Sequence, residues 1–166
     1  MNIEIKRLNN VDKSDLIALM NHPMVRRHLP LAKGVFDDEA YDGFIAAKEK
    51  LWREHGYGPW AFFFEKRFIG WGGLQYEEGD ADFALILHPN YWGFGKAVFD
   101  LIVRRAFLTM GLKSITALLP PSRLRLSVMN RLGFTRDGEV MLQGQRFLRF
   151  RLHGNADYVE RVLGKG

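Results

Sequence analysis

The segment that most constrains the fold joins a strand pattern to a helix pattern through two closely spaced glycines. An apolar run over 82–87 is followed by Pro89, by Gly93 and Gly95, and then by a helical pattern over 98–110. A helix that follows such a turn has first N–H groups without an internal partner, and its dipole adds partial positive charge there. These groups bind phosphate, and Lys96 adds a full positive charge. The segment therefore predicts a phosphate-binding corner.

The charge distribution favours an anionic ligand in the same half of the chain. Residues 1–89 carry 11 Lys or Arg against 14 Asp or Glu, whereas residues 90–151 carry 11 against 3. The basic surplus thus begins at the glycine turn and continues through the segments after it. Solubilising charges on exposed faces explain the same numbers, so the surplus alone does not identify a ligand.

Length and composition exclude several classes of protein. The 166 residues, 47% apolar and 26% charged, fit one soluble domain over 1–166. The absence of cysteine excludes disulfides and thiolate nucleophiles, and the five scattered histidines predict no metal site. No apolar stretch is long enough to span a bilayer, and the N-terminus has no apolar signal core. We expect a cytoplasmic protein without a membrane partner.

The periodicity of apolar residues predicts a mixed α/β fold. It indicates strands over 3–8, 60–65, 68–74, 82–87 and 114–119, a hairpin over 135–142 and 145–152, and helices over 11–21, 37–55, 98–110, 121–132 and 158–163. Tight turns are expected at Lys66-Arg67 and Gln143-Gly144, and 22–34 is expected to be irregular. Helices should pack on a central, partly antiparallel sheet.

The glycine turn matches neither common nucleotide-binding motif. It lacks the long loop and the hydroxyl of a P-loop, and residue 98 is Val where a dinucleotide fold has its third glycine. Instead, Asn90-Tyr-Trp-Gly-Phe-Gly-Lys-Ala97 resembles the Q/R-x-x-G-x-G/A turn of GNAT-type N-acetyltransferases. The branch that includes the ribosomal-protein N-terminal acetyltransferases, where Tyr-Trp-Gly-x-Gly is typical, is the most similar.

Two further segments carry the same resemblance. Residues 82–89 occupy the place of that branch's Glu-containing fourth strand, which ends in Leu-x-Pro. Residues 122–134 match, in length and in their Leu-Gly-Phe ending, its helix of the form N-x-x-S-x-x-x-x-E-K-x-G-F. Ser122 stands where that pattern has Asn, and Arg125 where it has Ser. The resemblance covers nearly the whole chain in element order.

The resemblance implies a fold and a cofactor site. The GNAT fold has a central, mostly antiparallel twisted sheet with splayed fourth and fifth strands and helices on both faces. The pantetheine arm of acetyl-CoA would pair with the backbone of the fourth strand, and its diphosphate would lie on the N–H groups of the turn. The implied cofactor-binding residues are Leu85, Ile86, Leu87, Trp92, Gly93, Phe94, Gly95, Lys96, Ala97, Ser122 and Arg125.

Acetyl transfer to an amine needs a base, because the attacking nitrogen must lose a proton. Asp82 is the first candidate, by its match to the strand Glu of the family, although a solvent-facing strand-end Asp is an equally good interpretation. His88, beside the turn, is the second candidate, and Ser122 retains a hydroxyl that can donate a hydrogen bond. Trp60 and Tyr76, at strand ends, would line the acceptor pocket unless they belong to the core.

The sequence therefore predicts an acyltransferase that moves acetyl from acetyl-CoA to a primary amine by direct attack in a ternary complex. The amine would be a protein N-terminus or a small molecule, and dimers are common among the proteins that this chain resembles. Two alternatives remain open. One is an acyl-CoA-binding sensor or interaction module with weak catalysis, which the residues at 122 and 125 favour. The other is a nucleic-acid-binding domain, whose phosphate contacts would weaken with salt; it would use Arg104, Arg105, Arg123, Arg125 and Arg131.

Overall fold

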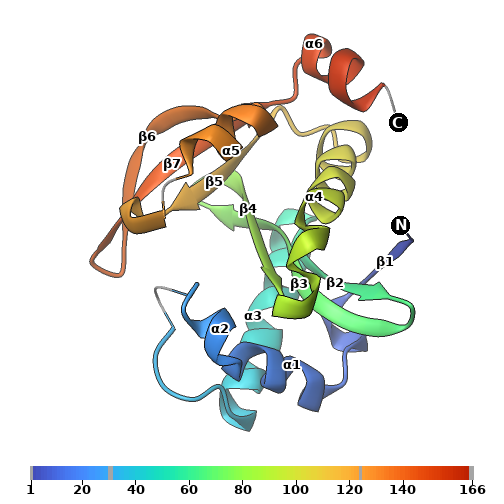
Figure 1. Cartoon of the computed structure of the whole chain (residues 1–166), viewed down its shortest axis with the longest axis vertical. Coiled ribbons are helices and arrows are strands. Elements are labelled where there is room, and N and C mark those ends of the chain that lie inside the picture. The colour runs from blue at the N-terminus through green and yellow to red at the C-terminus, as the bar shows by residue number, and fades with distance from the viewer. Residues whose placement is uncertain (1, 30–31, 124, 165–166) are drawn as a thin grey trace. The chain divides into compact units, whose positions relative to one another are not determined.

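The computed structural model describes residues 2–29, 32–123 and 125–164 (Figure 1). The chain divides into two compact units, and each is described by itself. The first comprises Met1–Tyr76 and Ala84–Phe99, and the second comprises Glu77–Phe83 and Asp100–Gly166. Strand β4 (Asp80–Leu87) and helix α4 (Gly95–Arg104) contribute residues to both units.

The first unit is built on an antiparallel meander. Strands β1 (Ile3–Lys6), β2 (Pro59–Phe64) and β3 (Arg67–Glu77) lie in this order, and β3 is followed by the second half of β4. Glu65 and Lys66 both adopt positive φ, 50° and 67°, at the β2–β3 turn. Its helices are η1 (Leu8–Asn10), α1 (Lys13–Asn21), α2 (Pro23–Arg26), α3 (Asp38–His55) and η2 (Pro89–Phe94).

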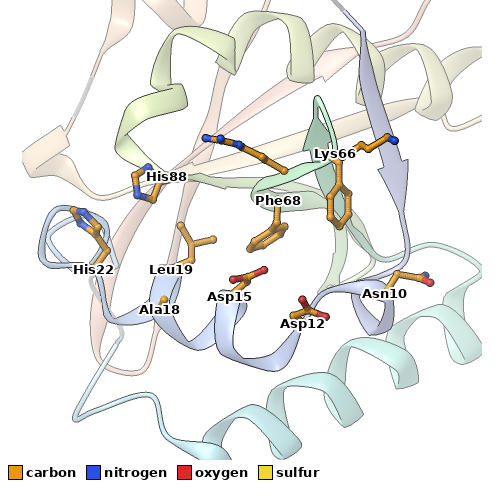
Figure 2. A pocket seen from close by; sticks show the side chains of 11 residues that line it. Asn10, Asp12, Asp15, Ala18, Leu19, His22, Lys66, Phe68 and His88 are labelled. Atoms are coloured by element: carbon orange, nitrogen blue, oxygen red, sulfur yellow. The ribbon is translucent and has the colours of Figure 1, made fainter.

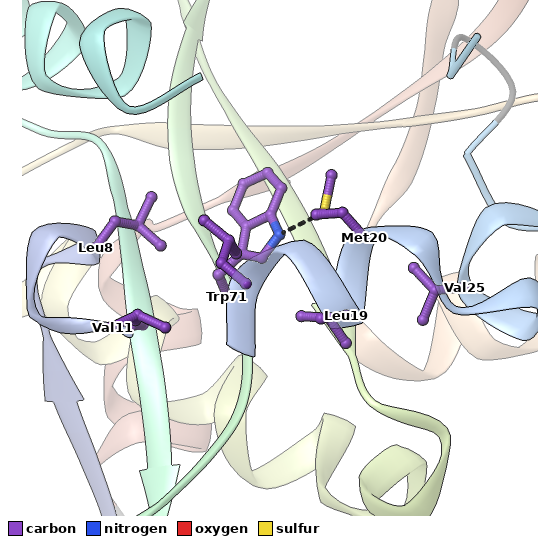
Figure 3. Packing of buried hydrophobic residues seen from close by; sticks show 8 residues of the cluster. Leu8, Val11, Leu19, Met20, Val25 and Trp71 are labelled. Carbon is purple, nitrogen blue, oxygen red and sulfur yellow. Dashed lines mark hydrogen bonds between the residues drawn. The ribbon is translucent and has the colours of Figure 1, made fainter. Parts of the chain in front are cut away.

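Helical segments cover both faces of this meander. One face packs on α1, α2 and α3 through a cluster that includes Leu16, Met20 and Trp71, and the indole N–H of Trp71 lies 3.3 Å from the sulfur of Met20 (Figure 3). Phe63 joins this cluster, whereas the next residue, Phe64, contacts Phe94 of η2. Because successive side chains of a strand point to opposite faces, η2 lies on the face opposite α1.

The second unit contains the rest of the sheet. Strands β5 (Ser114–Leu119), β6 (Thr135–Leu142) and β7 (Gln145–His153) follow β4 in the order β4-β5-β7-β6. The pairing of β4 with β5 is parallel and joins Asp82 to Thr116 and Phe83 to Ala117, whereas the other assigned pairings in the sheet are antiparallel. Its helical segments are the end of α4, η3 (Arg105–Thr109, a π-helical turn), η4 (Pro121–Arg123), α5 (Leu126–Leu132), α6 (Ala156–Tyr158) and η5 (Val159–Leu163, also π-helical).

The predicted elements are present, with shifted ends. The helix predicted over 37–55 forms as α3, where the side chain of Asp37 accepts a hydrogen bond from the N–H of Ala40 and Gly56 ends the helix at φ 75°. The first β2–β3 turn residue is Glu65 rather than Lys66, and 22–34 contains the short helix α2, so both predictions were wrong in detail. The helix predicted over 121–132 forms as η4 and α5, on either side of Leu124, which lies outside the described residues.

Candidate active site

The glycine turn is helical rather than an open loop. Strand β4 ends at Leu87, His88 caps η2, and η2 continues directly into α4 at Gly95, which has helical φ and ψ of −55° and −44°. The N–H of Gly95 already donates to the carbonyl of Trp92. Of the amides from Trp92 to Ala97, on which the diphosphate is expected to lie, that of Gly95 is thus already engaged. This amide is engaged because the end of η2 has 3₁₀ geometry, in which an N–H donates to the carbonyl three residues back.

The backbone does not need glycine at either position of the turn. Neither Gly93 nor Gly95 adopts the left-handed conformation, and a Cβ atom built on either would meet nothing within 4 Å. Glycine therefore contributes neither a special turn nor close packing here. Its remaining effect is to keep the backbone uncovered, which allows a ligand to approach the peptide groups closely.

Aromatic contacts fix the turn in place. Phe94 packs edge-to-face against Phe64 at 4.9 Å and against Tyr91 at 5.5 Å between ring centroids. The indole N–H of Trp92 donates to the carbonyl of Leu87 at 2.9 Å, while 44% of this residue stays exposed. Lys96 lies exposed in the first turn of α4. The uncovered peptide groups therefore belong to a well-anchored segment.

The backbone of β4 alternates between its two neighbours. The N–H of His88 donates to the carbonyl of Ile69 on β3 at 2.8 Å, so residues 84, 86 and 88 turn their polar groups toward β3. A Cβ atom at Gly70 would lie 2.2 Å from the carbonyl oxygen of Ile86, which shows how closely the two strands approach. Leu85 and Leu87 therefore point their backbone groups away from β3, and Ile86 does not. Of the three residues expected to pair with a cofactor arm, this geometry suits Leu85 and the N–H of Leu87, whose carbonyl already accepts from the indole of Trp92.

Asp82 lies in the second unit, at the parallel contact of β4 with β5. The hydroxyl of Thr116 donates to its carboxylate Oδ1 at 2.8 Å. Burial raises the pKa of Asp82 to about 7; the hydrogen bond from Thr116 opposes this rise, and the negative charges of Glu77 and Asp80 add to it. A carboxyl group with a pKa near 7 is suited to accept a proton at neutral pH, as a general base must.

His88 lines an open pocket of about 480 Å³ in the first unit (Figure 2). Its ring meets that of His22 edge-to-face at 5.2 Å, and each of these histidines precedes a proline and caps a helix. In both, Nδ1 accepts a hydrogen bond of 3.1 Å from the backbone N–H two residues later. Burial and the neighbouring His22 hold the pKa of His88 below its usual value. Because its Nδ1 lone pair is engaged, His88 is a weaker candidate for the base than Asp82.

The rest of the pocket is lined by side chains of both charges. The acidic side chains are those of Asp15 on α1 and of Asp12, which immediately precedes α1 (Figure 2). The basic ones are those of Lys66 in the β2–β3 turn and Arg67 at the start of β3, and the ring of Phe68 also lines the pocket. Apart from His88, none of the sequence-predicted site residues is among its lining residues. The pocket therefore adds a feature that the sequence did not indicate.

The two aromatic candidates differ in exposure. Trp60 is 7% exposed and packs edge-to-face on Trp52 at 5.3 Å, so it belongs to the core, and its predicted place in the acceptor pocket is corrected on this ground. Tyr76 is 41% exposed, and its ring stacks flat on that of His55 at 3.9 Å. Of these two residues, only Tyr76 is exposed enough for a ligand to contact it.

Ser122 and Arg125 lie in the second unit, after β5. Ser122 is exposed in η4, and Arg125 is exposed at the N-cap of α5 without a side-chain capping bond. Neither is built into the packing of its own unit, so each side chain is accessible to a ligand.

Sequence reasoning missed the partner of Asp82. Thr116 lies in the almost continuously apolar run 114–119 and is 1% exposed. A hydroxyl inside such a run must find a hydrogen-bond partner, and this was the available signal. The repeated pair His22-Pro23 and His88-Pro89 was a second signal, because both pairs cap helices.

Within 2–29, 32–123 and 125–164, no three His, Cys, Asp or Glu residues gather as they would around a metal ion. In the same ranges no helix combines the length and apolar character needed to cross a bilayer.

Comparison with known proteins identifies the family. The sequence over residues 2–135 matches the family described as acetyltransferase (GNAT) domain. Three solved structures share the fold at low identity. A chimera of Vibrio cholerae spermidine N-acetyltransferase SpeG and hSSAT has a TM-score of 0.70 and 14% identity over 93% of this chain and 96% of that one. A putative GNAT-family acetyltransferase from Bordetella pertussis has a TM-score of 0.71 and 15% identity over 90% of this chain and 94% of that one.

The third structure is the N-acetyltransferase PseH from Campylobacter jejuni in complex with acetyl coenzyme A. It has a TM-score of 0.66 and 18% identity over 93% of this chain and all of that one. At these identities the structures establish the fold, while the family match covers most of the chain. The seven-stranded sheet, with its parallel pairing of β4 and β5, is that of the GNAT fold. The chain belongs to the GNAT acetyltransferase family and is an acyltransferase.

Proposed function

We propose that this protein transfers the acetyl group of acetyl-CoA to a primary amine in a ternary complex, within one catalytic domain. Three observations support this: the family match, the uncovered glycines of the turn, and a largely buried carboxyl group whose pKa is raised to about 7. The last carries most weight, because amine acylation needs a base that is active at neutral pH. Among similar structures, SpeG is a spermidine N-acetyltransferase and PseH was solved with acetyl-CoA.

The cofactor would lie along the uncovered backbone. Its diphosphate would accept hydrogen bonds from the amides of the turn, at the start of α4, with Lys96 adding positive charge. Its pantetheine arm would pair with the outward backbone groups of Leu85 and with the N–H of Leu87, since the Leu87 carbonyl is bonded to Trp92. Ser122 and Arg125 would contact the arm or a phosphate as exposed donors. No step of the chemistry requires a metal ion.

In the reaction, Asp82 takes a proton from the substrate ammonium. The neutral nitrogen then attacks the thioester carbon, a C–N bond forms, and the C–S bond breaks as the tetrahedral intermediate collapses. The thiolate of coenzyme A leaves and takes up the second proton that the attacking nitrogen loses, so the products are the neutral acetamide and free coenzyme A. The hydrogen bond from Thr116 holds the Asp82 carboxylate in one orientation while leaving its second oxygen to receive the proton.

The identity of the amine is the finer part of this proposal. The Tyr91 to Gly95 motif favours a protein N-terminus, as in the ribosomal-protein branch, whereas the likeness to a spermidine N-acetyltransferase favours a polyamine. Exposed Tyr76, stacked on His55, is the aromatic candidate for a wall of the acceptor site.

Release of free thiol from acetyl-CoA would test the function with a panel of amines. The panel contains spermidine, an amino acid amide, an aminoglycoside and a peptide with a free N-terminus. We expect one class to drive stoichiometric thiol release and product acetylation by mass spectrometry, and Asp82→Asn to slow turnover by about 10²- to 10⁴-fold without weakening acetyl-CoA binding. Asp157→Asn is the matched control, because Asp157 is exposed and pairs with Arg161 at 3.4 Å. Acetyl-CoA binding without turnover of any amine would instead support the sensor alternative.

A further inference from the structure

Arg151 gathers two carboxylates in the second unit. Its Nη1 and Nη2 bind the two oxygens of Asp80 at 2.9 and 3.0 Å, and its Nε binds Asp137 at 2.8 Å. Nη1 also donates to the hydroxyl of Ser114 at 2.9 Å. Only 18% of the Arg151 side chain is exposed. A two-point contact of this kind is the strongest that an arginine makes with a carboxylate, so the guanidinium is held firmly.

The strand register shows that Arg151 lies in the same row as Asp82, although it binds Asp80. Asp82 pairs with Thr116 across β4 and β5, and Thr116 pairs with Arg151 across β5 and β7. Directly paired residues share a face of the sheet, so these three side chains form one row on one face. Asp80, two residues before Asp82, also lies on that face, in the row next to it. The backbone of Arg151 therefore lies in the row of Asp82, but its guanidinium binds the carboxylate of Asp80 in the next row.

The carboxyl groups of Asp80 and Asp82 on β4 consequently differ in their pKa. The hydrogen bond from Arg151 lowers the pKa of Asp80, whereas Asp82, with a neutral donor in Thr116, titrates far higher. The charges that act on Asp82 are the carboxylates of Glu77 and Asp80. Two arginines of β7 are engaged with other carboxylates: Arg151 binds Asp80 and Asp137, and Arg149 lies 3.3 Å from Asp137.

We propose that Asp80 is a positioning residue for catalysis: by binding Arg151 it withholds the guanidinium from Asp82, and so keeps Asp82 able to take a proton from the amine. This inference rests on the proposed function, in which Asp82 is the base. Asp80 itself touches neither substrate nor cofactor in this scheme. Its role is to fix where the one cation of the row points.

Substitutions of Asp80 and of Arg151 should have opposite effects on the ionisation of Asp82. Asp80→Asn removes one negative charge and releases Arg151 toward Asp82, and both changes favour the ionised form of Asp82. Arg151→Gln removes the cation and leaves Asp80 unpaired on the same face, which disfavours that form. A merely structural role for the pair would lower activity in both variants but would not move the titration of Asp82 in two directions.

The test is the pH profile of kcat/KM for the amine, measured from about pH 5.5 to about 9 with the same amine throughout. We expect the acid limb of the wild-type profile to move down by about 1 pH unit in Asp80→Asn, since a neighbouring opposite charge lowers a carboxyl pKa by about 1 to 3 units. It should move up in Arg151→Gln, return toward the wild-type position in Asp80→Glu, and stay unmoved in Asp157→Asn.

Unmoved limbs in both variants, or shifts in the same direction, would overturn the proposal. If one variant fails to fold, the direction of the other decides. The Asp82 carboxyl carbon, titrated by NMR in labelled protein, gives the same comparison without turnover. Failure of the proposed function looks different: the wild-type enzyme would then release no amine-dependent thiol, or its acid limb would persist in Asp82→Asn.

Discussion

Replacing Asp82 with Asn should stabilise the protein at neutral pH, because the wild-type carboxyl group is buried at a cost. Burial raises its pKa from 3.8 to about 7. Each unit of difference between the folded and unfolded states corresponds to about 1.4 kcal/mol, so the full penalty is on the order of 4 kcal/mol. Asn retains an oxygen that can accept the hydrogen bond from Thr116 but carries no charge to desolvate.

The sign of the pH dependence follows from proton binding. Between about pH 4 and about pH 7 the folded state keeps the Asp82 proton, whereas the unfolded state has lost it. The folded state therefore binds more protons, and the contribution of Asp82 to the free energy of unfolding falls as pH rises through this window. Below about pH 4 the penalty vanishes, and above about pH 7 it is constant.

Urea denaturation of wild type and Asp82→Asn at about pH 4, 5, 6, 7 and 8 measures this difference directly. The free energy of unfolding of the variant should exceed that of the wild type by an amount that grows from near zero to several kcal/mol. Asp157→Asn should differ from the wild type by a small, constant amount, since its carboxylate is exposed. A difference for Asp82→Asn that does not change with pH would refute the argument that burial of this carboxyl group sets its pKa.

Three further predictions concern the turn, the hydroxyl partner and the aromatic residues. Gly93→Val or Gly95→Val should keep the wild-type melting temperature without ligand, because both Cβ positions are open. Either variant should lose the stabilisation of about 2.7 kcal/mol that acetyl-CoA gives at a hundredfold excess over Kd. Thermal shift with and without acetyl-CoA measures both effects. Thr116→Val should move the acid limb of kcat/KM upward by removing the hydrogen bond that favours the ionised base, and the Ser variant should not. Trp60→Ala should cost about 3 to 5 kcal/mol in urea denaturation, whereas Tyr76→Ala should change KM for the amine with little loss of stability.

The sequence located the glycine turn but not its conformation. Glycines at 93 and 95 after a strand indicated a phosphate-binding corner, and this is where β4 ends and η2 and α4 begin. The pattern could not show that the turn is helical, because glycine suits open and helical backbones alike. The capping of η2 by His88 depends on a side chain folding back on its own helix, which periodicity does not report.

The contacts of Asp82 also show which features a local sequence pattern can and cannot predict. Asp82 was predicted by its place in a motif, whereas its partner Thr116 is 34 residues away and meets it only through the parallel pairing of β4 with β5. Arg151 and Asp80 are 71 residues apart. Such pairs depend on strand order and register, which local patterns do not specify. Trp60 was misplaced for a related reason: a strand-end aromatic is exposed or buried according to what packs on it, here Trp52.

A crystal structure with acetyl-CoA bound would show where the coenzyme lies on β4 and the glycine turn. The diphosphate should lie within hydrogen-bond distance of the amides around Gly93 and Lys96, and the pantetheine arm should bond to the outward backbone groups of Leu85 and to the N–H of Leu87. Density for the coenzyme elsewhere, with the turn uncovered and those groups bonded to protein, would contradict this placement.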